Sequence, residues 1–346
     1  MKTKLILLAA FIFALSTNVG FAQGCEDDAT PATASGTPST SSLKVFGYIQ
    51  PQYNNYFTDN GESTFNFKRA RIGVTGRVNR SFSYYVVLET SAFINGEDAS
   101  LLDAFVTWDK HEWTKVSLGS FKTPFGRDVT TACHSLTTID RSIVADQLVA
   151  PQRDMGLMLL GGSSKTKFRY SLAYMNGRGL SVNDNNEKKD VIGRATYQLF
   201  DMLNVGASFR LGYPNTDVDR TTYGFDAMFK YKDFSLQGEY IYDEGDYNRA
   251  AGGGCGSEPL ELGEKRQGAY IMAAYNVNKK LQPVFKYEFF DQDIDLKEIG
   301  YQERMTLGVN YFFNPKTRLQ INYQANIETY INQDNDALLM QLQVRF

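Results

Sequence analysis

The sequence predicts an all-β protein, a sixteen-stranded antiparallel β-barrel that spans a membrane. Three observations carry this prediction: alternating apolar and polar residues, an even number of strand-like segments, and alternating short and long connections. The alternation is clearest in residues 338–346, where one face is apolar throughout and the other is mostly polar, with Gln341, Gln343 and Arg345. A strand with two such faces separates two environments, so we expect lipid outside the barrel and water inside it.

Sixteen segments of the chain have the pattern of strands. In chain order they are 43–53, 64–78, 82–92, 101–109, 113–121, 153–161, 167–175, 189–198, 203–212, 221–231, 234–243, 266–276, 281–290, 301–312, 316–328 and 337–346. Bacterial single-chain barrels have an even number of strands. A soluble β-sandwich would also show alternation. Aromatic residues make up 14% of this chain, however, and large rings at strand ends are typical of membrane-interface girdles.

The connections between these segments alternate in length. Those after even-numbered strands are short, as at 79–81, 110–112 and 232–233. Those after odd-numbered strands are mostly long and polar: 54–63, 122–152, 176–188, 244–265 and 291–300. Outer-membrane barrels have short periplasmic turns and longer extracellular loops. On this count, 122–152 is the third extracellular loop.

Residues 1–22 have the features of a signal peptide. Lys2 and Lys4 precede an apolar stretch at 5–15, and a small-x-small cleavage site ends at Ala22. A membrane anchor is the alternative, but the apolar stretch is shorter than the roughly 20 residues that a spanning helix needs. We therefore expect an exported protein.

A flexible periplasmic tail is expected at 23–42, because this segment is rich in Thr, Ser, Pro, Ala and Gly and cannot form a core. The barrel domain then occupies 43–346. Lipidation at Cys25 is an alternative for the tail, although the residues before Cys25 lack the upstream Leu of a lipobox.

Charge and cysteine content narrow the class of protein further. The formal net charge is −3, which argues against binding to nucleic acid. The chain has three cysteines. Cys133 and Cys255 fall in long predicted loops and form a candidate disulfide; the alternative is that all three cysteines are incidental.

Five short runs carry a family likeness: 67–73 (FKRARIG), 103–106 (DAFV), 117–126 (SLGSFKTPFG), 140–142 (DRS) and 153–156 (RDMG). Together they resemble the phosphate-selective porin O/P family, and the resemblance extends from Gly47 to about Gly162. It implies a porin in the outer membrane of a Gram-negative bacterium, surrounded by lipid and assembled as a homotrimer. It also implies passive diffusion of small hydrophilic solutes, with the 122–152 loop folded inward to narrow the pore.

Basic residues with inward positions are candidates for lining the channel. Arg69, Arg71 and Arg77 share one face of the second strand, and guanidinium groups present fork-shaped donors that suit oxyanions. The full set of candidate channel-lining or anion-binding residues is Arg69, Arg71, Arg77, Lys122, Arg127, Arg141, Arg153 and Arg194. The alternative is that the arginines pair with carboxylates such as Glu89 on the next strand, and both interpretations can hold together.

An anion preference is expected, with phosphate-type anions as candidate substrates. Inward basic positions only slightly outnumber acidic ones, and the 122–152 loop is balanced in charge. The family likeness implies a lysine-rich constriction, which this sequence lacks. The sequence therefore supports a general anion preference better than selectivity for phosphate.

Other functional classes have weaker support. A surface adhesin or structural barrel with little channel activity is the main alternative, with the long loops as its working parts. A hydrolase would need a nucleophile and base such as Ser135 and His134 near Asp140, but nothing places these residues on rigid strands. Asp291, Asp293 and Asp295 begin like a calcium loop, yet Leu296 stands where the loop needs Gly. We expect no catalytic residues, metal ligands, cofactor or nucleic-acid partner.

Overall fold

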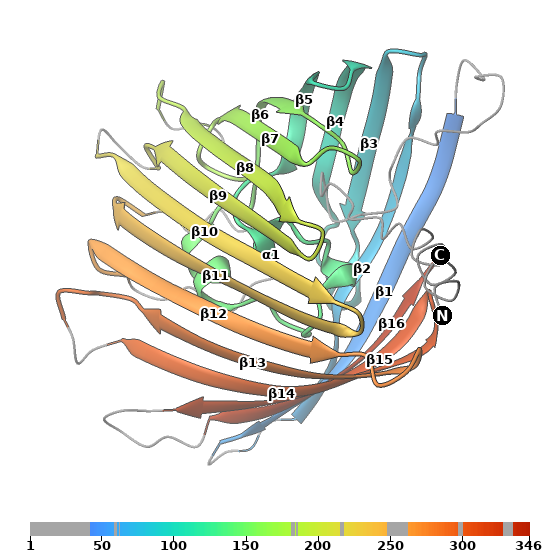
Figure 1. Cartoon of the computed structure of the whole chain (residues 1–346), viewed down its shortest axis with the longest axis vertical. Coiled ribbons are helices and arrows are strands. Elements are labelled where there is room, and N and C mark those ends of the chain that lie inside the picture. The colour runs from blue at the N-terminus through green and yellow to red at the C-terminus, as the bar shows by residue number, and fades with distance from the viewer. Residues whose placement is uncertain are drawn as a thin grey trace, which may run out of the picture.

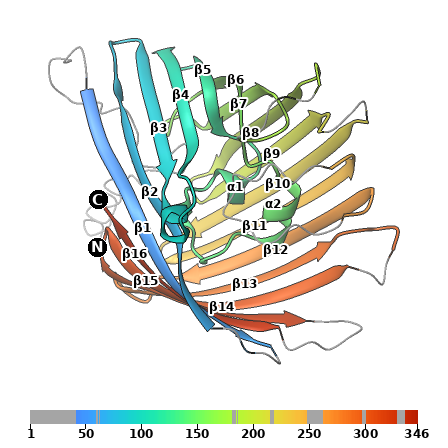
Figure 2. The ribbon, with the colours of Figure 1, turned by 180° about the vertical axis from the view of Figure 1, so that it is seen from behind.

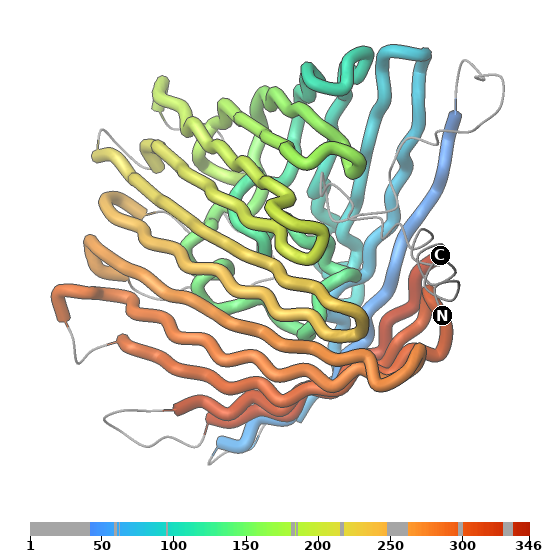
Figure 3. The backbone as a smooth tube through the Cα atoms, viewed as in Figure 1, coloured from blue at the N-terminus to red at the C-terminus, as the bar shows by residue number. Residues whose placement is uncertain are grey.

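The computed structural model describes residues 42–58, 61, 63–180, 184, 186–214, 218–247, 262–296, 300–327 and 335–346. Within these residues sixteen strands form one closed barrel (Figures 1 and 3). The strands are β1 (Ser42–Phe57), β2 (Ser63–Arg77), β3 (Phe82–Glu89), β4 (Ser100–His111), β5 (Thr114–Lys122), β6 (Arg153–Gly161), β7 (Phe168–Met175), β8 (Asp190–Phe200), β9 (Leu203–Gly212), β10 (Arg220–Tyr231), β11 (Phe234–Gly245), β12 (Lys265–Tyr275), β13 (Leu281–Asp291), β14 (Tyr301–Asn314), β15 (Thr317–Ile327) and β16 (Asp336–Arg345).

Each strand pairs antiparallel with the next one in sequence, and the last strand closes the ring. β16 pairs antiparallel with β1, in a register that sets Tyr48 opposite Arg345 and Phe57 opposite Asp336. Closure leaves no open sheet edge, which a wall inside a bilayer requires because lipid offers no hydrogen bonds. The predicted sixteen-stranded antiparallel barrel is confirmed.

One predicted strand is shorter than expected. The third strand, predicted at 82–92, ends at Glu89, and a 3₁₀ helix η1 (Ser91–Asn95) follows. The Glu89 carboxylate accepts the backbone N–H groups of Ala70 and Ser91, at 2.8 and 3.2 Å. A side chain thus takes the place of backbone acceptors at this point, and the strand ladder stops.

The outer surface of the barrel is apolar, as the alternation predicts. On β10, Tyr223, Phe225 and Tyr231 are exposed by 43%, 61% and 52%. On β15 the opposite face is polar and buried, with Gln320 and Asn322 at 1% and 0% exposure. The aromatic and aliphatic rows therefore face outward, where a membrane barrel meets lipid.

The sequence predicts that water lines the whole inner surface of the barrel, but part of this surface is apolar and covered. Inward residues of β3–β8 and β11–β13, among them Met175, Ile192 and Ile241, form a buried apolar cluster with the short helix α2 (Ile143–Leu148). An amphipathic helix inside a barrel needs an apolar surface to cover its own apolar side. Part of the interior is consequently a dry core, which simple strand alternation could not reveal.

The predicted signal peptide (1–22) lies outside the described residues, as does the predicted tail at 23–42 except for Ser42, which begins β1. Across the described ranges, no helix has the length and hydropathy needed to cross a bilayer.

Candidate functional site: the barrel interior

The connection between β5 and β6, residues 122–152, is called the inner segment here. It contains α1 (Arg127–Thr130), the 3₁₀ turn η2 (Cys133–Ser135) and α2. Its backbone N–H groups donate to side chains on strands around the barrel: Gly126 to Ser208 on β9 (3.0 Å), Asp128 to Glu239 on β11 (2.9 Å), Ile143 to Glu288 on β13 (2.7 Å) and Ile139 to Asn322 on β15 (2.8 Å). A segment bonded to so many inward side chains of a closed ring lies within that ring (Figure 2).

Inward Gln and Asn side chains of β14–β16, called the amide wall here, hold the middle of the inner segment. Gln320 and Asn310 donate side-chain N–H groups to the carbonyl of Thr137, at 3.2 and 2.9 Å. Gln343 and Arg318 donate to the carbonyl of His134, at 3.1 and 2.9 Å. Backbone groups of a loop that carry no strand partner need other partners when buried. The Gln and Asn residues of β14–β16, which the sequence presents as a plain polar face, supply them.

Two arginines hold the far end of the segment. Arg220 donates to the carbonyls of Leu148 and Ala150, each at 2.6 Å, and Arg210 donates to Ala150 at 2.8 Å. Cations near the last carbonyls of a helix are favourable because those carbonyls have no partner within the helix. Arg220 therefore caps the C-terminal end of α2, and Arg210 helps it to hold the chain just beyond the helix.

The predicted arginine row on β2 is inside the barrel, but its members differ in their partners. Arg71 pairs with Glu89 at 2.7 Å and Arg77 with Asp109 at 2.7 Å. Arg69 donates to the Gln50 side chain at 2.9 Å. The pairing alternative thus describes Arg71 and Arg77, whose charges are balanced by a carboxylate on a nearby strand.

Arg153 stands where the inner segment enters β6. Its guanidinium pairs with Asp103 of β4 at 3.0 Å, and both side chains are fully buried. A buried pair of this kind joins the two strands firmly, since either partner alone would be a desolvated charge. The structure gives Arg153 a structural setting away from open solvent.

Lys122 and Arg141 make contacts within the inner segment itself. The Lys122 ammonium donates to the carbonyl of Val129 at 2.7 Å, and Arg141 donates to the carbonyl of Thr131 at 2.9 Å. Asp128 lies 3.9 Å from Arg141. The two cations thereby tie the C-terminal end of α1 to the end of β5 and to the residues before α2.

Asp140, in the same segment, is held as an anion. Burial would raise the pKa of Asp140, but the Lys68 ammonium 2.7 Å away, helped by Lys286 and Arg69, holds it well below its usual range. Gln324 donates to the other carboxylate oxygen at 3.2 Å.

Of the two candidate disulfide residues, the structure describes only Cys133. Cys133 is buried beside Arg71, whose Nη1 lies 3.2 Å from its sulfur. Cys255 lies outside the described residues, so the disulfide stays a prediction.

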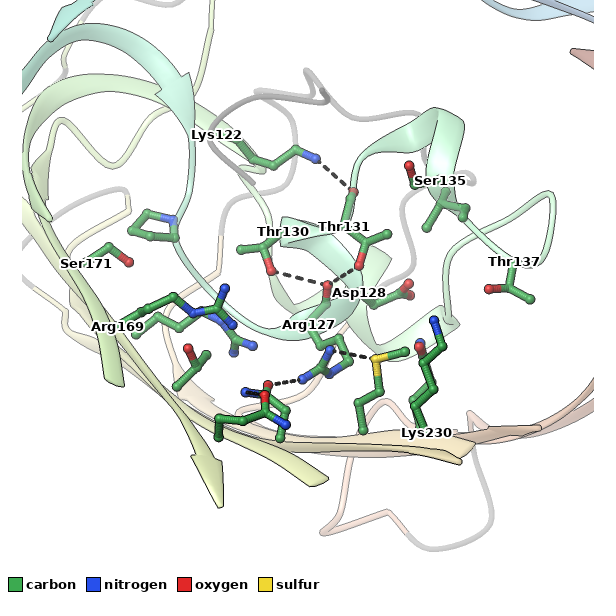
Figure 4. A pocket seen from close by; sticks show the side chains of 18 of the residues that line it. Lys122, Arg127, Asp128, Thr130, Thr131, Ser135, Thr137, Arg169, Ser171 and Lys230 are labelled. Carbon is green, nitrogen blue, oxygen red and sulfur yellow. Dashed lines mark hydrogen bonds between the residues drawn. The ribbon is translucent and has the colours of Figure 1, made fainter. Parts of the chain in front are cut away.

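A cavity of about 480 Å³ remains between the inner segment and the wall formed by β6–β12 (Figure 4). Five cationic side chains line it against two acidic ones, Asp128 and Asp201; the cations are Lys122, Arg127, Arg169, Arg194 and Lys230. Arg127 and Arg194 share the carboxylate of Asp226, at 2.9 and 2.5 Å. The predicted candidates Lys122, Arg127 and Arg194 therefore meet at one cavity, whereas Arg69, Arg71, Arg77, Arg141 and Arg153 do not line it.

Arg169 is the residue that the candidate set lacks. It lies on β7, with Ser171, Ala173 and Met175 on the same inward face, and it is 9% exposed. Figure 4 shows Arg169 extending from the barrel wall toward the part of the cavity where Arg127 of α1 lies. The period-2 pattern of β7 alone could have placed it inward, because Phe168, Leu172 and Tyr174 occupy the exposed outer face.

A closed sixteen-stranded barrel with an apolar belt, an internal segment and a cation-lined cavity defines an outer-membrane porin. The family described as phosphate-selective porin O and P matches residues 46–218 and 202–346, almost the whole barrel. The chain belongs to this family. A comparison with curated proteins found no match.

Solved porins have the same fold. A loop-deletion mutant of OmpT from Vibrio cholerae is 14% identical, with a TM-score of 0.65, and the alignment covers 89% of this chain and 100% of that one. An anion-selective porin from Comamonas acidovorans is 12% identical, with a TM-score of 0.65 and coverage of 88% and 99%. A trimer form of OmpT is 13% identical, with a TM-score of 0.64 and coverage of 89% and 100%. At these identities the likeness concerns the fold.

Proposed function

We propose that the protein lets small hydrophilic solutes diffuse across the outer membrane and prefers anions. The observation that carries the preference is the excess of cationic over acidic side chains around the cavity beside the inner segment. Rings of Arg and Lys favour anions in a pore because the surrounding wall screens them less than bulk water does. The anion-selective porin from Comamonas acidovorans has the same fold and supports the proposal by analogy.

We further propose that solutes pass along the β6–β12 side of the inner segment. The segment is bonded to the amide wall of β14–β16, so that side is filled by direct contacts. The cavity lies on the opposite side. Selection would then combine size, set by the gap between α1 and the wall, with charge, set by Arg127, Arg169 and Arg194.

The test is the zero-current potential of purified protein in a planar bilayer under a KCl gradient. We expect the zero-current potential of the native protein to have the sign that indicates chloride preference. In Arg169→Gln we expect this potential to shift toward the value of a cation-preferring channel. Lys165→Gln is the matched control, because Lys165 is an exposed cation in the β6–β7 turn that does not line the cavity. Equal permeability of K⁺ and Cl⁻ in the native protein would remove the anion preference, and absence of ohmic conductance would remove the channel.

We propose that the porin forms homotrimers, as a solved form of OmpT does. The apolar outer faces of the strands provide surface both for lipid and for neighbouring subunits. Chemical cross-linking in outer-membrane fragments tests this: bands up to the trimer support it, and only monomer after complete cross-linker reaction contradicts it.

We also propose that export removes residues 1–22 and leaves 23–42 as a periplasmic tail ahead of the barrel. The intact mass of protein extracted from outer membranes checks the cleavage site after Ala22. A mass that includes a lipid on Cys25 would favour the lipoprotein alternative instead.

A further inference from the structure

The cavity beside the inner segment has an apolar side as well as a cationic one. Met158 and Leu160 of β6, Met228 of β10, Met272 of β12 and Leu136 of the inner segment all line it. The four strand residues occupy inward positions of a porin barrel, where alternation leads one to expect polar residues. Met158, Leu160 and Met272 also belong to the apolar cluster that packs with α2, so the cavity borders an apolar surface that hydrated inorganic ions do not need.

We propose that this cavity binds organic anions that carry an aromatic or short aliphatic body, such as aryl carboxylates, in preference to inorganic phosphate. The inference rests on the proposed channel function and narrows its substrate class. A carboxylate would lie toward the guanidinium groups of Arg127, Arg169 and Arg194, and the apolar body would lie against the methionines.

The geometry of the cavity fits such a ligand. Its volume of about 480 Å³ falls in the range of small-molecule sites, which are largely apolar with a few polar groups that fix orientation. Methionine adapts to irregular apolar ligands and makes favourable contacts with aromatic rings. Guanidinium groups bind carboxylates through paired N–H donors.

The contact between Arg127 and Met228 joins the two sides of the cavity. Arg127 Nη1 lies 3.3 Å from the sulfur of Met228, and Nη2 donates to Asn204 at 2.6 Å (Figure 4). The cation and the thioether are therefore adjacent on one wall. An anion bonded to this guanidinium would have its apolar part within reach of the methionine.

The experiment measures block of the KCl current through the purified full-length porin by three probes: benzoate, acetate and inorganic phosphate. Benzoate and acetate share the carboxylate and differ in the ring. We expect benzoate to block at a concentration roughly tenfold lower than acetate, because burying the ring removes apolar area from water. Equal half-blocking concentrations for benzoate and acetate, or tighter block by phosphate, would overturn the proposal.

Two substitutions at Met228 separate the apolar contribution from the positioning of Arg127. Met228→Gln keeps an acceptor for Arg127 but removes the apolar surface, so the preference for benzoate over acetate should fall by about threefold. Met228→Leu keeps the apolar surface and loses the acceptor, so it should retain the preference. The reverse order in the two variants contradicts the proposal.

Arg169→Gln tests the charged side. It should weaken block by benzoate and acetate by the same factor, since both offer a carboxylate, while Lys165→Gln should leave both unchanged. Each variant is also measured for ohmic conductance and zero-current potential in KCl alone. If the native protein has the conductance and the zero-current potential of an anion-preferring channel but is not blocked by benzoate, the ligand inference fails and the porin function stands.

Discussion

Arginines inside this barrel serve two purposes, and the neighbouring carboxylates decide which. Arg153 and Asp103 are completely buried and 3.0 Å apart, so their charges cancel within the wall. Arg127 and Arg194 share the single carboxylate of Asp226, which leaves a net positive charge beside the cavity. The residue type alone does not separate these cases; the count of acidic partners within reach does.

Removal of Asp103 should destabilise the barrel strongly. Asp103→Asn leaves Arg153 as a buried cation, and we expect a loss of about 3–5 kcal/mol in the free energy of unfolding. The measurement is urea-induced unfolding of the refolded protein in lipid vesicles, followed by tryptophan fluorescence.

The control is the other ion pair on β4, Asp109 with Arg77, whose side chains are 10% and 22% exposed. Asp109→Asn should cost clearly less, because water can solvate Arg77. A double replacement of Asp103 and Arg153 by leucine should recover most of the loss. A cost for Asp103→Asn no larger than that for Asp109→Asn would contradict the account of a desolvated pair.

At the scale of the element, the inner segment depends on side chains from distant strands. The N–H of Ile139 donates to Asn322, 183 positions along the chain, and the N–H of Asp128 donates to Glu239, 111 positions away. α1 has four residues and α2 six, too short to be stable alone. Their conformation is therefore maintained by the wall around them.

Loss of the amide wall should make the inner segment move. Gln320→Ala with Asn322→Ala removes partners of Thr137 and Ile139, so we expect larger open-channel current fluctuations without a change in barrel assembly. Gln302→Ala, on β14 outside the contacts with residues 134–140, is the control. Current noise in planar bilayers and the heat-modifiable gel migration of each variant are the measurements. Identical noise in the double variant and the control would show that these bonds do not hold the segment.

At the scale of the whole molecule, the barrel and the inner segment have separate sources of stability. The ring is closed by strand pairing from β1 to β16 with no contribution from residues 123–152. The segment in turn contributes Ile143, Val144 and Leu148 to the apolar cluster inside. The wall can therefore form without the segment, but its inward apolar residues would then face water.

Replacement of residues 126–147 by a short Gly-Ser linker should widen the channel. We expect a larger single-channel conductance, a higher size limit for sugars in liposome swelling and a weaker ion preference, because the cavity loses one of its two walls. The folded barrel should be recovered, at lower stability. Unchanged conductance in a properly assembled variant would mean that the inner segment does not bound the solute path.

The sequence by itself determines the strands of the barrel wall and their outward faces, because strand alternation is a local property. Residues two apart share a face, so the row Leu338 to Phe346 specifies which side meets lipid whatever the strand pairs with. The alternation of short and long connections orders the hairpins for the same reason. The predicted strand positions consequently agree with the sixteen that form the barrel.

The interior was decided only by the tertiary structure. Arg127 finds Asp226 across 99 positions, and Arg169 joins the cavity because β7 stands next to β8 and opposite α1. Which cations share one carboxylate, and which inward apolar residues border the cavity, depends on contacts between distant parts of the chain. Such contacts follow from closure of the ring around its own loop, since only closure sets the distances between side chains on opposite walls.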